Sequence, residues 1–173
     1  LATFLRGSTD GRSVVVRTGS LDGDGEALFR ITNTLIGEDA AAPGTFALAG
    51  KEPLFLTERG VYAITAEELT GEKYSQERSY YISTALEAAE GKAGACAIVW
   101  RDFYVLALEG VLYLLDLRQR SYEKNSPYSS FQYECYYFPG IPARVLFQDG
   151  DALCFGQADG KLRRFGTNVD DPG

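Results

Sequence analysis

The side chains that most often carry catalysis are scarce in this sequence, and histidine is absent altogether. Without histidine the commonest general base is missing, and so are the serine and cysteine triads and nearly every catalytic zinc site. What remains is carboxylate chemistry, in which a paired acid and base hydrolyse a glycosidic bond. Glu87 and Glu90 share a helix-compatible face at a spacing of three residues, and Glu67 and Glu68 form a second acidic pair. Charged runs of this kind are usually solvated surface, so we predict no catalytic residue.

Residues 22–26 (DGDGE) concentrate the oxygen ligands that calcium prefers. The spacing of an EF-hand fails, because Asn33 stands where a glutamate is needed and Ala27 where the invariant glycine is needed. We therefore expect a Gly/Asp turn between two strands and no metal site. The glycines of residues 19–25 lack the spacing of a phosphate-binding loop, and we predict no cofactor.

The three cysteines, Cys96, Cys135 and Cys154, lie far apart, each within an apolar or aromatic run. No cationic residue stands beside them in the sequence to lower a thiol pKa, which argues against a nucleophilic role. An odd number of such cysteines favours small buried side chains in a reduced protein over a disulfide framework.

Aromatic side chains are in surplus between residues 122 and 138. They are Tyr122, Tyr128, Phe131, Tyr133, Tyr136, Tyr137 and Phe138. Strand alternation buries only about half of such a set. Packing against neighbouring strands is the simpler explanation for the rest, but tyrosines on loops also give rigid contact area for sugars or protein partners. If there is a binding surface, Tyr74, Tyr122 and Tyr128, each in a long predicted connection, are its candidate residues.

The elements that must position these residues are predicted to be β-hairpins. Residues 103–117 (FYVLALEGVLYLLDL) form two apolar runs joined at a Glu-Gly turn, and residues 54–64, 152–165 and, more loosely, 1–17 have the same construction. The turn glycines of these hairpins stand 49, 50 and 50 residues apart. A period near 50 residues with several short strands per unit is typical of a propeller-type array.

We therefore predict an all-β fold, a β-propeller-like array of about four blades within a single domain of residues 1–173. The blade units are residues 1–33, 45–83, 95–138 and 143–166, with three, four, four and three strands. Both terminal blades are incomplete. Three arrangements stay open: four blades that close imperfectly, a piece of a larger propeller, or two copies that associate to cover open blades.

Within the units, three details can be compared with a structure. The fourth strand of the second unit is predicted at residues 78–83, with a turn of helix in the charged residues 65–76. Residues 84–94 are predicted to be a connector that begins as a helix. The apolar runs at 103–108 and 111–117 hardly alternate, which indicates strands buried on both faces.

The composition narrows the choice of partner and compartment. A net charge of −7, with no offsetting cluster of Lys or Arg, disfavours nucleic acid and anionic membrane surfaces. No apolar stretch of membrane-spanning length and no signal-peptide pattern is present, so we expect a cytoplasmic or virion-associated protein. The chain also contains no methionine, which suggests that it is processed or cut from something longer.

Residues 152–167 (ALCFGQADGKLRRFGT) resemble the second hairpin of propeller repeats in the quinoprotein and WD-repeat classes, although the G-H and W-D dipeptides of true WD repeats are absent. Residues 53–64 are similar to segments of propeller-like structural proteins encoded by bacteriophages and prophages of gut Firmicutes. The resemblance spans about residues 45–165 and implies a virion or tail-associated component. We therefore expect a non-enzymatic structural or protein-interaction module. The alternatives are a carbohydrate-binding or carbohydrate-cleaving propeller and, third, a redox-cofactor propeller.

Overall fold

The computed structural model describes residues 2–6, 13–36, 40–66, 73–122 and 130–166, and strands dominate among them. They form four antiparallel sheets in which strands that are adjacent in sequence are also neighbours in the sheet. The first sheet is β1 (Ala2–Arg6), β2 (Ser13–Leu21) and β3 (Ala27–Ile36), and the second is β4 (Ala47–Ala49), β5 (Glu52–Leu56), β6 (Val61–Ala66) and β7 (Lys73–Glu77). The third is β8 (Cys96–Trp100), β9 (Phe103–Leu108), β10 (Val111–Tyr122) and β11 (Phe131–Pro139), and the fourth is β12 (Ala143–Asp149), β13 (Ala152–Gln157) and β14 (Leu162–Arg164).

Helical turns are confined to the connections. The 3-10 turns are η1 (Pro43–Thr45), η2 (Tyr80–Ile82) and η3 (Lys92–Gly94), and one short helix, α1 (Ser83–Ala88), follows η2 directly. The helix lies where a helical start to the connector was predicted. Lys92, which is buried, donates from Nζ to the carbonyl oxygens of Glu87 and Ala89 and so satisfies the C-terminal end of α1.

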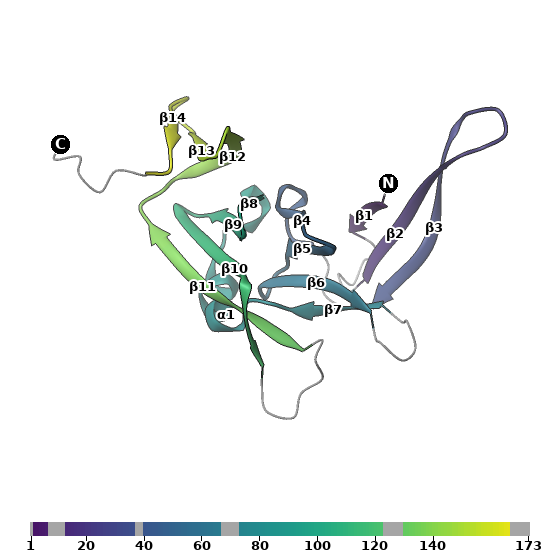
Figure 1. Cartoon of the computed structure of the whole chain (residues 1–173), viewed down its shortest axis with the longest axis horizontal. Coiled ribbons are helices and arrows are strands. Elements are labelled where there is room, and N and C mark those ends of the chain that lie inside the picture. The colour runs from purple at the N-terminus through teal and green to yellow at the C-terminus, as the bar shows by residue number, and fades with distance from the viewer. Residues whose placement is uncertain (1, 7–12, 37–39, 67–72, 123–129, 167–173) are drawn as a thin grey trace.

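The four sheets follow one another along an open arc (Figure 1). The first sheet, with its long β2–β3 hairpin, and the fourth sheet stand at opposite ends of the arc. The first strands β4, β8 and β12 lie toward its concave side, and β4 and β12 each approach β8. The last strands β7 and β11 lie on the convex side. The four sheets have three, four, four and three strands, in the order predicted for the units, although β3 runs three residues past the first unit and β11 one residue past the third. The described sheets do not close a ring.

The core lies between the faces of successive sheets. One cluster joins the second and third sheets, with Leu56 on one side and Leu106 and Leu115 on the other. A second cluster joins the opposite face of the third sheet, which carries Leu112, to Leu153 of the fourth. The prediction that β9 and β10 are buried on both faces is confirmed, because alternate residues of these strands belong to the two clusters.

The predicted strand at residues 78–83 is wrong. The fourth strand of the second sheet is β7, which ends at Glu77, and residues 80–82 form η2 instead. The helical turn expected at 65–76 is also wrong in its described part, where residues 65–66 complete β6 and residues 73–76 belong to β7; residues 67–72 lie outside the described chain. Residues 73–76 form a strand because β7 pairs with β6, and such pairing overrides a weak local preference for helix in charged residues.

In the described residues, no helix has both the length and the apolar character needed to cross a membrane.

Candidate functional site

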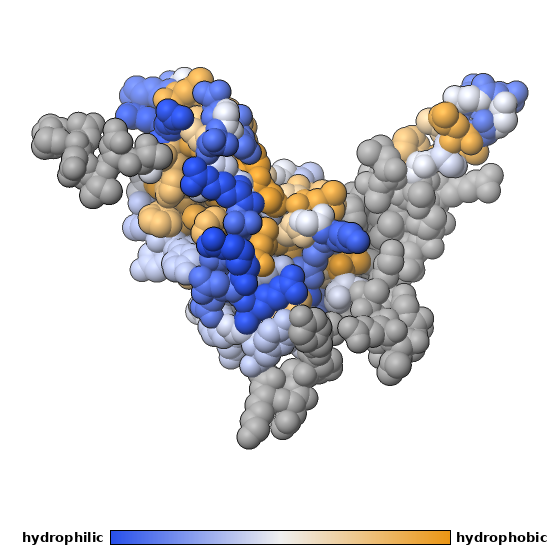
Figure 2. Space-filling model, in the orientation of Figure 1, coloured by the Kyte–Doolittle hydropathy of each residue, from blue (hydrophilic) through white to orange (hydrophobic). Residues whose placement is uncertain are grey.

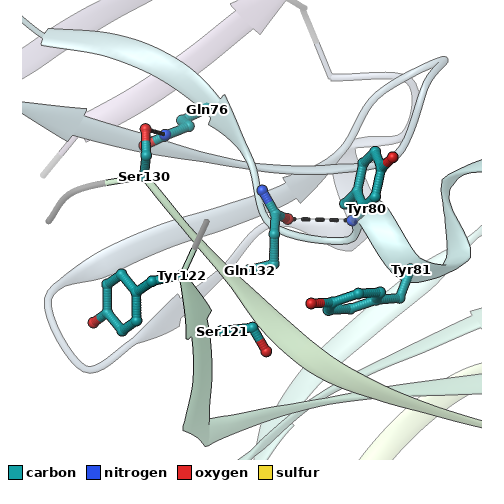
Figure 3. Close-up of a pocket in the computed structure, with 7 residues that line it drawn as sticks. All are labelled: Gln76, Tyr80, Tyr81, Ser121, Tyr122, Ser130 and Gln132. Atoms are coloured by element: carbon teal, nitrogen blue, oxygen red, sulfur yellow. Dashed lines mark hydrogen bonds between the residues drawn. The ribbon is translucent and has the colours of Figure 1, made fainter. Parts of the chain in front are cut away.

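A tyrosine-lined pocket of about 210 Å³ lies where the second sheet meets the third (Figure 3). We call it the tyrosine pocket. Among the described residues, its lining consists of three tyrosines, two amides and two hydroxyls: Tyr80, Tyr81, Tyr122, Gln76, Gln132, Ser121 and Ser130. They come from the end of β7, from η2, from the end of β10 and from the start of β11. Side chains about fifty residues apart in sequence therefore face one pocket.

The third sheet reaches the pocket through a long extension of β10 and β11. The β10–β11 register slips between Asp116 and Arg120, so that β10 carries extra residues opposite the step from Glu134 to Tyr133. Such a bulge bends a strand and re-aims the side chains beyond it. Here those beyond it include Ser121 and Tyr122, which line the pocket.

Asp116 holds the bulge in place although it stands in an otherwise apolar run. Its carboxylate accepts bonds from the backbone N–H of Arg118 at 3.0 Å, from the Arg118 guanidinium at 3.0 and 2.9 Å, and from the Gln119 amide at 3.2 Å. The hydrogen bonds from Arg118 hold the pKa of Asp116 below its usual value, against the opposing effect of burial. The charged carboxylate is thus the form that fixes this turn.

Two amides connect the opposite walls of the pocket. Gln132 of β11 accepts the backbone N–H of Tyr80 at 3.2 Å through its side-chain oxygen (Figure 3). Its side-chain nitrogen donates to the Glu77 carbonyl oxygen at 3.2 Å. Gln76 of β7 donates to the Ser130 hydroxyl at 2.5 Å. These bonds set η2 and its tyrosines against the third sheet. A buried oxygen, Gln76 Oε1, has no hydrogen-bond partner among the described residues.

Beneath the pocket lies a buried ion-pair network that fixes Phe131, the residue on which Tyr122 packs. The Arg78 side chain is fully buried, and its Nη2 lies 2.8 Å from Glu52 Oε1. Its Nη1 donates to the Phe131 carbonyl oxygen at 3.1 Å, and the guanidinium lies 3.9 Å from the centre of the Phe131 ring. Tyr133 donates its hydroxyl to Glu52 at 3.0 Å. Burial, together with the charge of Glu52, raises the pKa of Tyr133.

The Tyr122 ring packs against Phe131 with a centroid separation of 6.0 Å, while Arg120 covers Phe131 at 4.3 Å. Phe131 therefore sits between two guanidinium groups, which favour the face of an aromatic ring. The pocket wall that carries Tyr122 rests on a packed and hydrogen-bonded layer. A wall supported in this way is preorganised for a ligand.

The lining can form hydrogen bonds and aromatic contacts, and its described residues include no Asp, Glu, Lys or Arg. Tyr80, Tyr81 and Tyr122 are 60, 55 and 43% exposed, respectively. The described lining contains no carboxylate, and Glu134 stands behind it, where it accepts the Ser121 hydroxyl at 2.6 Å. The arrangement suits recognition of an uncharged polar group better than acid–base chemistry.

The structure places the three predicted contact tyrosines differently. Tyr122 lines the pocket. Tyr74 is a residue of β7, opposite Thr65 of β6, and only its backbone is described. Tyr128 lies outside the described residues. Tyr80 and Tyr81 were missed because the predicted strand at 78–83 would have buried one of them; the helix-compatible residues that follow them were the signal for a turn.

The other groups considered for chemistry lie apart from the tyrosine pocket. Glu87 and Glu90 are exposed on and after α1, and Glu67 with Glu68 lies outside the described residues. Residues 22–26 form the expected turn: Asp22 accepts the backbone N–H groups of residues 24 and 26 at 3.0 and 2.8 Å, and residue 25 is a glycine with a positive φ of 82°.

The three cysteines are unpaired and partly or fully buried. Burial raises the pKa of Cys135 to about 12, with Glu134 adding to the effect, and burial also raises the pKa of Cys96. Thiols with raised pKa values are poor nucleophiles at neutral pH, in keeping with their place within strands.

A second surface stands out on the fourth sheet, on the face turned away from the third. Val145, Gly156 and Leu162 lie side by side across β12, β13 and β14. We call them the open row. Val145 is 50% and Leu162 is 71% exposed. Figure 2 shows mixed hydrophobic and hydrophilic surface over this sheet and a hydrophobic strip along the concave side of the arc.

The corresponding row of the third sheet is covered. Cys96, Ala107 and Leu112 lie side by side across β8, β9 and β10, and Leu112 is fully buried. What covers this row is the inner face of the fourth sheet. The open row therefore presents the same kind of side chains, and no sheet of the described residues lies above it.

Among family models, curated proteins and solved structures, none matches this chain.

Proposed function

We propose that the protein is a non-enzymatic structural and protein-interaction module, a propeller-like array of blades in one domain. The succession of sheets supports the array: each packs a face on the next, and the first strands gather on the concave side as inner blade strands do around a propeller axis. The resemblance of residues 53–64 supports a place in a phage or prophage assembly as a virion or tail-associated component.

The observation that carries the interaction is the open row. Each described contact between the last three sheets buries apolar rows face to face, and the fourth sheet carries one further such row with Leu162 71% exposed. Blades of this kind cannot bury their apolar faces alone, so an uncovered face calls for another sheet. We propose that a second copy of the chain supplies it, with the two fourth sheets packed face to face about a twofold axis.

A binding role rather than catalysis is supported by the residue types available. The chain has no histidine, and the lining of the tyrosine pocket contains amides, hydroxyls and aromatic rings. These groups bind and orient a ligand, and the described lining includes no Asp, Glu or Lys that could act as general acid or base.

The test is the molar mass of the whole chain in solution, measured by light scattering over a range of concentrations. Wild type is expected to approach twice the monomer mass as concentration rises, and Leu162→Glu to remain monomeric because it places a charge in the apolar contact. Leu21→Glu is the matched control, since Leu21 is 73% exposed and lies in the first sheet. A wild-type chain that stays monomeric, or equal behaviour of the two variants, contradicts the proposal.

A further inference from the structure

We propose that the tyrosine pocket binds a single uncharged sugar ring, as a free saccharide or as the terminal unit of a glycan. This inference is independent of self-association through the fourth sheet, because the pocket lies between the second and third sheets. It rests on four properties of the lining: its exposed rings, its convergent hydrogen-bonding groups, its lack of charge and its size.

The exposed rings stand on two sides of the pocket. Tyr80 and Tyr81 lie together on η2, with ring centroids 6.0 Å apart in an edge-to-face arrangement, and Tyr122 lies across the pocket on β10 (Figure 3). A pyranose ring carries C–H groups on its faces and hydroxyls around its rim. A tyrosine offers a matching apolar face with a polar tip, and it loses little conformational entropy on binding.

Between the tyrosines stand groups that can pair with sugar hydroxyls. Ser121 and Gln132 lie between the two sides of the pocket, and Gln76 with Ser130 forms a further edge (Figure 3). Hydroxyls both donate and accept, and side-chain amides offer both kinds of site, so they suit a ligand whose every hydroxyl does the same. Gln76 Oε1 is buried without a described partner, so this amide keeps an acceptor that its bond to Ser130 leaves unused.

The lack of charge selects a neutral sugar. None of the described lining residues is basic, and the guanidinium of Arg120 lies over the Phe131 ring rather than in the lining. Glu134 stands one hydrogen bond behind the lining, through the Ser121 hydroxyl, and the chain carries a net charge of −7. An acidic sugar would meet this like charge with no cation among the described lining residues to pair with it.

The size of the pocket limits the ligand to one ring. Its volume of about 210 Å³ is below the roughly 300 to 1,000 Å³ of sites that hold drug-sized molecules. A proline-rich peptide is the other ligand that exposed tyrosines suggest, but such peptides lie along an extended aromatic groove. Here amides and hydroxyls converge on one compact space, which favours the sugar.

The experiment screens the whole chain on an array of neutral, acidic and sulfated glycans, and then titrates the best neutral hit into ¹⁵N-labelled protein. We expect binding to neutral glycans only, with shifts centred on residues 80, 81, 121, 122 and 132. Tyr81→Ala should weaken binding roughly 3- to 10-fold, the range of one aromatic contact. Tyr137→Ala is the matched control, because this tyrosine of β11 is 65% exposed and lies outside the lining; it should change affinity less than about twofold.

A variant that keeps the ring separates binding from folding. Tyr81→Phe retains the stacking face and should bind more tightly than Tyr81→Ala, while far-ultraviolet circular dichroism reports whether each variant is folded. The proposal is overturned if no neutral glycan binds, if acidic glycans bind as well as neutral ones, if the shifts lie elsewhere, or if a proline-rich peptide occupies the pocket in place of sugar. Molar mass measured on the same samples reports self-association separately.

Discussion

The third and fourth sheets present corresponding side chains in opposite surroundings. Leu112 of β10 pairs with Ala107 and is fully buried, whereas Leu162 of β14 pairs with Gly156 and is 71% exposed. The two leucines stand fifty residues apart, each on the sheet face directed away from the preceding sheet. Burial is therefore a property of the neighbouring sheet rather than of the residue, and a sheet becomes core only when another sheet covers it.

The contact between the second and third sheets should contribute most to the stability of the array. Arg78→Ala is expected to lower the free energy of unfolding by about 3 to 5 kcal/mol, because it leaves Glu52 partly buried without its cation. Arg164→Ala, at an exposed position of the fourth sheet, should change it by less than about 0.5 kcal/mol. Urea unfolding followed by circular dichroism measures both. Equal effects would mean that the network contributes no more than a surface charge.

Removal of both charges sharpens this prediction. Replacement of Arg78 and Glu52 together by apolar residues of similar size should recover much of the stability, since the cost of Arg78→Ala arises from an unpaired charge. If the double variant is no more stable than Arg78→Ala, packing of the guanidinium on Phe131 at 3.9 Å is the larger contribution.

The two corresponding leucines test the comparison directly. Leu112→Ala should cost about 2 to 5 kcal/mol, because it opens a cavity between the third and fourth sheets. Leu162→Ala should cost less than about 0.5 kcal/mol when measured at a concentration where the chain is monomeric. At higher concentration the proposed self-association adds a penalty to Leu162→Ala. A large cost at low concentration would instead place Leu162 in contact within one chain.

The sequence predicted the strands better than the surface they build. A continuous apolar run that ends at a turn glycine placed β9 at Phe103–Leu108, and both-face burial followed from the apolar runs of β9 and β10. The tyrosine pocket could be predicted only at Tyr122. Arg78 looked like a strand residue, yet its burial depends on Glu52 and Phe131, which come from other strands. Contacts between sheets determine where β7 ends, and these contacts cannot be predicted from the local sequence pattern.

The bulge that aims Tyr122 gives a smaller and pH-dependent effect. Asp116→Asn should lower stability by about 1 to 2 kcal/mol at pH 7, because it removes charge from the hydrogen bonds to Arg118. The pKa of Asp116 is lowered in the folded chain, so its contribution is complete above the unfolded value of about 3.9 and is lost as pH falls through the folded value. The gap between wild type and variant should therefore close below about pH 4.

Asp159 provides the contrast in the fourth sheet. It pairs with Lys161 at 2.9 Å but lies in an exposed turn, so Asp159→Asn should leave the unfolding midpoint unchanged in 0.15 M salt. If Asp116→Asn behaves in the same way, then the bulge is held by strand pairing rather than by the carboxylate. The glycan affinity of the Asp116→Asn variant would then also stay at the wild-type value.

The smallest expected difference in stability between the third and fourth sheets lies in the first hairpin turn of each. Arg101 of the third sheet has a left-handed φ of 52°, where the fourth sheet has Gly150 at 55°, and an aspartate follows in both turns. Gly150→Arg should cost about 1 kcal/mol, since a residue with a Cβ is strained in this conformation. Arg101→Gly relieves that strain but loses the guanidinium contact 4.6 Å from the Trp100 ring centre, so the two effects should nearly cancel. Thermal unfolding of both variants shows whether the Trp100 contact offsets the backbone strain. If Arg101→Gly is more stable than wild type by about 1 kcal/mol, the Trp100 contact contributes nothing to stability, and arginine in this turn destabilises the fold.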